Sequence, residues 1–289
     1  MLSGILLALA AAACFECSYV LQALEVRAVP AMTRASVGAL RRLATRPVWL
    51  GSIALGLAGF GLQVLALRHA PLSLVQPLLA TGLLGLLAFS ATVLGEAVGR
   101  REALAVVAIV AGVTLIALAD PRRGAAVAPG PAFVLAGAAL AIVALSAFVR
   151  RSPRGGGLLA AAIAADALAA LAAAQAARAL PGVVAVAGWC ALAAAGGVAA
   201  VAAESAVLQR RGAARVAPVV LAGQVAVPVA LAPLVIGERW GSPALLACGL
   251  ALVIAGSAAL ASSAGVSRLA LGQPEDEVRG GGQVGDLRP

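Results

Sequence analysis

Residues 72–95 read LSLVQPLLATGLLGLLAFSATVLG, a run of 24 residues without a charged side chain. A helix of about 20 apolar residues crosses the hydrocarbon core of a bilayer. This run therefore predicts a transmembrane helix. Apolar runs of similar length lie at roughly 2–24, 48–68, 72–95, 102–119, 131–149, 157–178, 182–208, 215–236 and 243–262. The sequence predicts an all-α membrane protein with about nine transmembrane helices.

The composition fits a chain whose main partner is the lipid bilayer. Of the 289 residues, 62% are hydrophobic and 11% are charged, and the mean hydropathy is +1.03, whereas soluble domains have about 25% charged residues. The first run is not expected to be a cleaved signal peptide, because no basic residue precedes it and Glu16 interrupts it. The net charge is +9, but the arginines separate the apolar runs instead of forming one polar face, so no nucleic-acid partner is expected.

The arginines also predict the orientation of the helices, because short cytoplasmic loops collect positive charge. Sixteen of the 21 basic residues, all arginines, lie in alternate loops and in the C-terminal tail, which are therefore expected to be cytoplasmic. With nine spans, the N-terminus is predicted outside and the C-terminus inside the inner membrane. The opposite side receives only Arg68, Arg122, Arg123, Arg178 and Arg239.

Two stretches of the chain repeat one pattern, in which an apolar helix ends in a Gly-Glu pair and a last apolar helix contains Ala-Gly. The matching positions are Pro71, Gly95, Glu96 and Ala111-Gly112 in the first stretch, and Pro218, Gly237, Glu238 and Ala255-Gly256 in the second. Corresponding helices are five apart, an odd number, so we expect two inverted structural repeats. The predicted organisation is a first repeat at 2–119, a connector with helix five at 120–150, a second repeat at 151–262 and a disordered cytoplasmic tail at 263–289.

Polar side chains inside the apolar runs are candidates for a substrate or proton pathway, because acids and amides are costly in lipid. Glu204 is predicted to lie opposite Gln63 across the pseudo-symmetry and to load and release a proton, with Glu16 or Asp166 as neighbouring acids of the same character. The alternative for Glu204 is a neutral acid hydrogen-bonded to Ser205 or to a facing backbone. The full set is Glu16, Gln63, Gln76, Asp166, Glu204 and Gln224.

Prolines mark a second kind of candidate. Pro77 in helix three, and Pro218 and Pro228 in helix eight, are expected to break these helices and to free carbonyls for a cation or an amide substrate. The alternative is an ordinary kink without a ligand. Glu96 and Glu238 need less explanation, since nearby arginines are expected to pair with them at the ends of equivalent helices. These partners are Arg100, Arg101 and Arg239.

Signatures of enzymes and metal sites are missing from the sequence. There is no G-x-S-x-G, no H-E-x-x-H and no P-loop. The single histidine, His69, has no Cys, Asp or Glu at ligand spacing, and the four cysteines form neither a disulfide framework nor a zinc pattern. We therefore expect no enzyme activity and no cofactor, and we leave any metal ligand unassigned.

The stretch Ala70-Pro71-Leu72-Ser73-Leu74-Val75-Gln76-Pro77-Leu78, followed by Leu94-Gly95-Glu96, resembles the drug/metabolite transporter (DMT) superfamily. Gly237-Glu238 repeats that mark in the second half. Nine helices, an outer N-terminus and a basic loop after helix one are similar to the NIPA-type magnesium transporters rather than to the ten-helix EamA-type exporters. The resemblance implies a helical bundle of two inverted halves, a central substrate path and alternating access.

The resemblance leaves the substrate open. In the NIPA-type pattern, helix two has a Gly-Glu pair a few residues before an Asn, and these positions correspond here to Gly59, Phe60 and Gln63. Since Phe60 replaces the acid, a secondary transporter of a small organic solute, coupled to protons, is the leading expectation. A NIPA-like transporter of magnesium or another divalent cation is the alternative. A non-transporting membrane scaffold or regulatory subunit is the alternative of another class, and a homodimer remains open.

Overall fold

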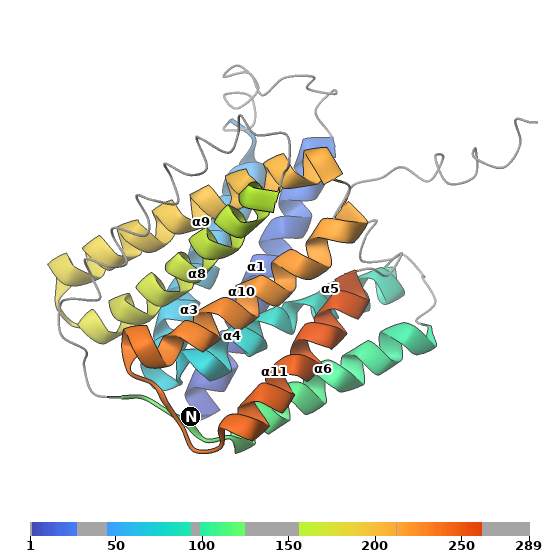
Figure 1. Ribbon diagram of the computed structural model, residues 1–289. Coiled ribbons are helices and arrows are strands. Elements are labelled where there is room, and N and C mark those ends of the chain that lie inside the picture. Colours follow the sequence, from blue (N-terminus) through green and yellow to red (C-terminus); the bar gives the residue numbers. More distant parts are fainter. Residues whose placement is uncertain (1, 28–44, 94–98, 125–155, 212, 262–289) are drawn as a thin grey trace, which may run out of the picture.

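The computed structural model describes residues 2–27, 45–93, 99–124, 156–211 and 213–261, and these residues are mostly helical (Figure 1). The predicted connector helix at 131–149 and the tail at 263–289 lie outside the described residues. Two very short strands join the helices at one end of the bundle. The elements are α1 (Leu2–Arg27), α3 (Pro47–His69), α4 (Leu72–Ala80), α5 (Gly82–Val93), α6 (Arg100–Leu118), β1 (Pro121–Arg122), α8 (Gly156–Ala179), α9 (Val183–Arg211), α10 (Ala213–Ile236), β2 (Arg239–Trp240) and α11 (Pro243–Ala261).

Six of the described helices are long and apolar enough to cross a membrane. These spans are Leu2–Gln22, Pro47–His69, Arg100–Leu118, Leu159–Ala179, Val183–Val201 and Pro243–Leu260, with shorter apolar helices at Leu72–Gly85 and Ala222–Ile236. Large apolar side chains point outward on them, including Leu57, Leu104 and Val198, as expected for helices that face lipid. The prediction of an all-α, multi-pass membrane protein is confirmed at this level.

The long apolar run at 72–95, predicted as one transmembrane helix with a break at Pro77, forms two helices whose junction lies at Thr81 instead. The chain forms α4, turns at Thr81 and continues as α5 from Gly82. The Thr81 hydroxyl donates to the Leu78 carbonyl at 2.6 Å, so the last carbonyls of α4 are satisfied locally instead of by a continuing helix. Pro77 lies inside α4. The junction therefore falls four residues after the proline, where Gly82 and Gly85 weaken helix propensity.

The expected break in helix eight is not present. α10 runs as one α-helix from Ala213 to Ile236, past Pro218 and Pro228. A proline in a helix removes one backbone hydrogen bond, and the packing of α10 against α4, α8 and α11 offsets that loss. The carbonyl four residues before each proline still lacks its helical donor, so the prediction of free carbonyls does not require a break.

Three pairs of helices pack along their lengths: α1 with α3, α8 with α9, and α6 with α11. Figure 1 shows α8 and α9 on one side of the bundle, α6 and α11 on the other, and α4 and α10 between them. Small residues allow the close contact of α6 and α11, because a Cβ added to Gly112 would lie 2.6 Å from the Gly249 carbonyl oxygen. Every residue of α4 from Leu72 to Leu78 is buried, so α4 is the centre of the bundle.

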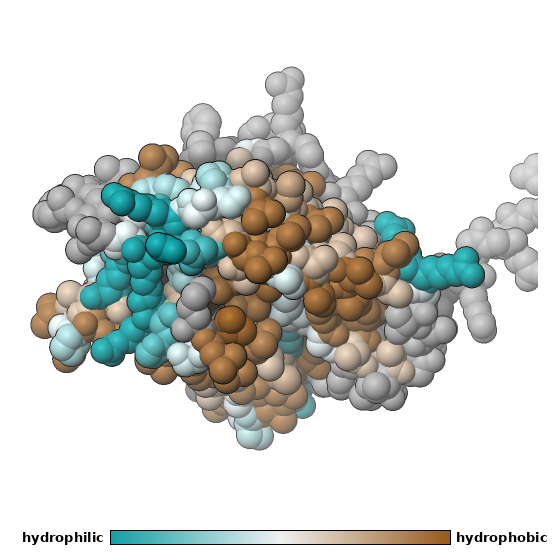
Figure 2. All heavy atoms as spheres, turned by 90° about the horizontal axis from the view of Figure 1, so that it is seen from below, coloured by the Kyte–Doolittle hydropathy of each residue, from teal (hydrophilic) through white to brown (hydrophobic). Residues whose placement is uncertain are grey.

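One end of the bundle is closed by β1 and β2, and we call it the β1–β2 end. The strands pair antiparallel, Pro121 with Trp240 and Arg122 with Arg239. α10 ends at Ile236. The next residue, Gly237, has a φ of 64° that suits glycine, and the amide of Glu238 donates to the Ala232 carbonyl at 3.3 Å. Figure 2, seen from this end, shows hydrophilic residues gathered on one side of a largely apolar surface.

Candidate functional site

The six predicted pathway residues lie on six different helices of the bundle. Glu16 is on α1, Gln63 on α3, Gln76 on α4, Asp166 on α8 and Gln224 on α10; Glu204 is on α9. They do not form one cluster. The described residues separate them into three groups, which lie near the β1–β2 end, at the middle of the bundle and in the C-terminal part of α9.

The group near the β1–β2 end consists of two amides. Gln63 lies six residues before the end of α3 and Gln76 four residues after the start of α4, so both are within about 9 Å of this end along the helix axes. The two residues are 8% and 7% exposed. Neither amide is hydrogen-bonded to the described residues, and their nitrogen and oxygen atoms are not fully buried, because Ser257 Oγ is the only fully buried polar side-chain atom without a partner in the described part of the chain. Buried amides are normally hydrogen-bonded. These two therefore have donors and acceptors available for another molecule.

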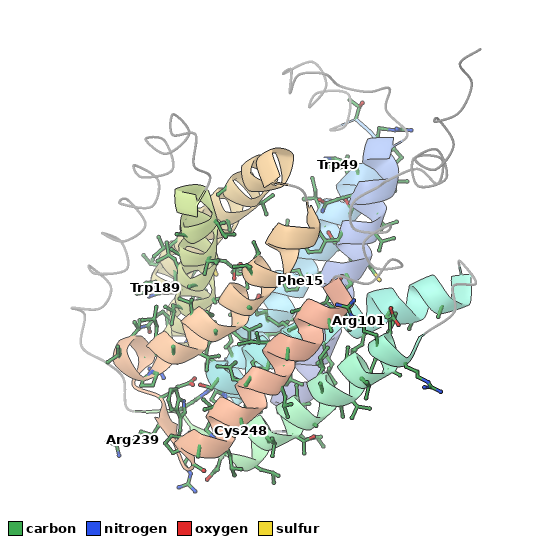
Figure 3. All side chains as sticks on the ribbon, turned by 45° about the vertical axis from the view of Figure 1, so that its right-hand side comes forward. Phe15, Trp49, Arg101, Trp189, Arg239 and Cys248 are labelled. Atoms are coloured by element: carbon green, nitrogen blue, oxygen red, sulfur yellow. The ribbon has the colours of Figure 1, made fainter. Side chains whose placement is uncertain are left out.

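The middle of the bundle contains Glu16, which faces the junction of α4 and α5. A Cβ added to Gly82 would lie 2.7 Å from Glu16 Oε1, so only glycine leaves room for this carboxyl group. Glu16 is half-buried and has no hydrogen-bond partner among the described residues. Figure 3 shows the neighbouring Phe15 inside the bundle, between Trp49 at one end and Arg239 at the other. Glu16 is thus an acid at the point where the central helix is interrupted.

Asp166 and Gln224 lie at one level in the second half of the chain. Gly223 of α10 lies against Ile163 of α8, since a Cβ added to Gly223 would lie 2.6 Å from that side chain. Asp166 is three residues after Ile163, and Gln224 follows Gly223. Both polar side chains are half-buried and interact within the protein. Their predicted role in a substrate or proton pathway stays a prediction.

Three further predicted positions are Glu204, Gly95 and Glu96. Glu204 lies in α9, seven residues before the helix ends at Arg211, and its prediction as a pathway residue is not tested. Gly95 and Glu96 lie outside the described residues. The expected pairing of Glu96 with Arg100 and Arg101 is therefore not tested.

Glu238 forms the most complete polar cluster among the described residues. Its carboxylate accepts hydrogen bonds from the backbone amides of Leu72 and Ser73 and from the Ser73 hydroxyl, with 3.1 Å to the Ser73 amide. These amides are the unbonded donors at the first turn of α4, where the helix dipole favours a negative charge. Glu238 is only 4% exposed. A residue that follows α10 therefore caps α4 from the other half of the chain.

Further side chains hold the same turn. Trp240 Nε1 donates to Ser73 Oγ at 3.1 Å, and Arg123 Nη2 donates to the Ala70 carbonyl at 3.0 Å. Burial raises the pKa of Glu238, and the hydrogen bonds from Ser73 and Leu72 and the charge of Arg178 oppose that rise. Burial also lowers the pKa of Arg123, and the nearby Arg178 lowers it further. This end is a compact network of charges and hydrogen bonds.

The network corrects the expectation that Glu238 pairs with Arg239. Arg239 is exposed and makes no ion pair among the described residues. The positive end of α4 supplies preorganised donors in a buried setting, whereas an exposed ion pair contributes little. Ser73, Trp240 and Arg123 were not singled out by sequence reasoning. Glu238 is 165 residues from Ser73, and no local pattern signals that contact.

A metal centre is not evident within the described part of the chain. No group of three His, Cys, Asp or Glu side chains there could hold a metal ion. Phe60, at the position where the resemblance implies an acid, packs against the apolar core. His69 is exposed at the end of α3. Oxygen donors in this region come instead from Gln63 and Gln76.

Comparison of the chain with protein-family models, with curated proteins and with solved structures gives no match. The conclusions about this protein therefore rest on its own residues and their arrangement.

Proposed function

We propose that the protein is a secondary transporter of the drug/metabolite transporter type, which moves a small organic solute across the inner membrane by alternating access, coupled to protons. The observation that carries the proposal is the pair of buried amides, Gln63 and Gln76, without hydrogen-bond partners among the described residues. The nitrogen and oxygen atoms of these amides are accessible and are not bonded to the described residues. A polar solute that enters the bundle can therefore hydrogen-bond to them, which is a reason to place such groups on a solute path.

Carboxyl groups at the middle of the bundle support proton coupling. Glu16 faces the α4–α5 junction through Gly82, and Asp166 lies close to the contact between Ile163 and Gly223. An acid within an apolar bundle takes up and releases protons according to its surroundings, and intramembrane acids commonly form proton relays. Glu204 remains a proposed member of the pathway, nearer to the end of α9. No chemical conversion of the solute is part of this proposal.

The helix packing supports the two inverted repeats that alternating access requires. With α4 and α5 together as helix three, α1 and α3 are helices one and two, and α8 and α9 are helices six and seven. These equivalent pairs both pack along their lengths, and α6 packs along α11 as helix four against helix nine. In each half, a glycine of the third helix lies against the first helix, Gly82 on Glu16 and Gly223 on Ile163. The ninth helix of the proposal is the connector at 131–149.

The arrangement of the ends supports the proposed orientation, with the N-terminus outside and the C-terminus cytoplasmic. Gly4 packs on Ala70, which places the start of α1 at the β1–β2 end. All five arginines assigned to the outer side lie in or next to turns at this end or in the last turn of α8. Arginines assigned to the cytoplasmic side, such as Arg27, Arg46 and Arg211, lie at or next to the opposite ends of the described helices, so the β1–β2 end is the proposed outer face.

A divalent cation is the alternative substrate, because amide and carboxyl oxygens are hard ligands of the kind that Mg²⁺ and Ca²⁺ prefer. Gln63, Gln76 and Glu16 could supply such oxygens, although Phe60 removes the acid that the NIPA-type pattern has in helix two. The alternative of another class is a non-transporting scaffold or regulatory subunit. A scaffold has no need of acids inside the bundle and would tolerate their neutralisation together.

The experiment is a flux assay in proteoliposomes that hold a pH dye. Amino acids, nucleosides and quaternary ammonium compounds are added one at a time across a proton gradient, and a parallel set holds a magnesium dye. We expect one organic class to drive proton movement, and Glu16→Gln to abolish that movement. Glu102→Gln is the matched control, since Glu102 is a half-buried acid in the first turn of α6, away from this pathway.

Each alternative has its own outcome in this assay. Magnesium flux without proton movement by any organic solute would favour the divalent-cation transporter. Absence of all flux, together with normal folding of the triple variant Glu16→Gln, Asp166→Asn and Glu204→Gln, would overturn the transport proposal in favour of a scaffold.

A further inference from the structure

The turn between α3 and α4 is held by side chains from distant parts of the chain. Glu238 binds the first amides of α4, Trp240 binds the Ser73 hydroxyl, and Arg123 binds the Ala70 carbonyl. The turn belongs to the first half of the chain, whereas Glu238 and Trp240 belong to the second. The cluster therefore connects the two halves directly at the β1–β2 end.

The connection is rigid on both sides. Glu238 follows the left-handed Gly237, whose backbone lies so close to Gly124 that a Cβ on Gly124 would be 1.6 Å from the Gly237 carbonyl oxygen. Trp240 is fixed by its strand pairing with Pro121. On the other side, Leu72 and Ser73 are fully buried at the start of the central helix. The Glu238 carboxylate is thus held in a fixed position against the first turn of α4. Its hydrogen bonds to Leu72 and Ser73 cannot be kept if the two halves of the chain move apart at the β1–β2 end.

The cluster also lies directly above the proposed solute site. Gln76 is one helical turn after Ser73 on α4, and it is 7% exposed with no hydrogen-bond partner among the described residues. Gln76 is thus largely covered in this structure, and along α4 the cluster lies between it and the β1–β2 end. Alternating access needs such a closed end and a discrete contact that releases it.

We propose that Glu238 is the latch of the β1–β2 end: its carboxylate joins the loop after α10 to the N-terminus of α4, and the path to Gln76 opens at this end only when that contact breaks. This proposal rests on the proposed transport function, whereas the contact between Glu238 and the first turn of α4 is present in the structure itself. Ser73 and Trp240 position the carboxylate, and neither is proposed to touch the solute.

The test measures the accessibility of a cysteine at Gln76 in lipid nanodiscs. The four native cysteines, Cys14, Cys17, Cys190 and Cys248, are first replaced by alanine, and Gln76→Cys is then labelled with a charged methanethiosulfonate reagent. We expect slow labelling with Glu238 present and labelling at least tenfold faster with Glu238→Ala. Glu238→Gln, which keeps the size but loses an acceptor oxygen, should give an intermediate rate. Arg239→Ala, in the same loop but exposed, is the matched control and should leave the rate unchanged.

Labelling rates within twofold of the parent for both Glu238 variants would overturn the latch. Gel filtration of each variant shows whether the bundle is folded, and Glu238→Gln with Ser73→Ala replaces Glu238→Ala if the latter does not fold. Solute flux of the wild-type protein is measured separately. Faster labelling without any flux would keep the latch and reject the transport function, whereas flux with unchanged labelling would keep transport and reject the latch.

Discussion

Two polar regions of this bundle lie about one helical turn apart and differ in one respect. In the Glu238 cluster, the buried carboxylate accepts three hydrogen bonds, and Ser73 is bound by two partners. Gln63 and Gln76 are also largely buried, but their amides have no partner among the described residues and are not fully buried. A buried polar group with its hydrogen bonds made stabilises the fold, whereas an accessible group without a partner can bind another molecule. The first region is structural by this criterion, and the second is available for a solute.

The largest expected effect on stability comes from Glu238→Ala. It removes the acceptor from the buried amides of Leu72 and Ser73, and an unpaired buried donor costs about 1–3 kcal/mol. We expect the free energy of unfolding to fall by about 3 kcal/mol, measured by thermal or denaturant unfolding in detergent. Arg239→Ala is the control, because Arg239 is exposed and outside the cluster. Equal stability of both variants would show that the cluster does not hold the end together.

A smaller effect is expected from Trp240→Phe. The substitution keeps the aromatic packing but removes the hydrogen bond from Nε1 to Ser73 Oγ, and a single hydrogen bond contributes about 1 kcal/mol. The unfolding midpoint should fall by less than that of Glu238→Ala. A double variant of Glu238→Ala and Trp240→Phe should lose less than the sum, because both changes act on Ser73. Strict additivity would contradict a shared network.

The contribution of the Glu238 cluster to the free energy of unfolding should depend on pH. Burial raises the pKa of Glu238 above its ordinary value of 4.5, so the folded protein holds this proton more tightly than the unfolded chain. The free energy of unfolding should therefore fall as the pH rises from about 4.5 through the raised pKa. Arg123 and Arg178 face Glu238 and stay charged in this range, and Ser73 and Trp240 do not titrate there. The difference in melting temperature between wild type and Glu238→Gln should follow this trend; a constant difference would contradict it.

Sequence patterns predict most helices because lipid imposes a simple rule of length and hydropathy. The predicted spans at 48–68, 157–178 and 243–262 agree within two residues with α3, α8 and α11. A break in helix three was predicted at Pro77, but the junction lies at Thr81. The continuity of α10 was not predicted, since a proline shows that a hydrogen bond is lost but not whether the helix goes on. Tertiary packing around each proline determines the result.

The candidate site was predicted in part. Gln63, Gln76 and Glu16 are polar residues within apolar runs, and their burial or inward position follows from that pattern. The role of Glu238 could not be read from the sequence, because the helix it caps begins with Leu72, 166 residues away. The nearest opposite charge in the sequence, Arg239, is exposed instead. Proximity along the chain is a weak guide where a buried helix end offers stronger partners.

The most direct test of this account combines stability and flux for one double variant, Gln63→Leu with Gln76→Leu. Replacing unpaired buried amides by apolar groups of similar size should leave the melting temperature unchanged or slightly higher, while solute flux in proteoliposomes falls at least tenfold. Gln175→Leu, the same change at a half-buried position of α8, serves as the control and should keep its flux. A stable double variant with wild-type flux would contradict the claim that these amides bind the transported solute.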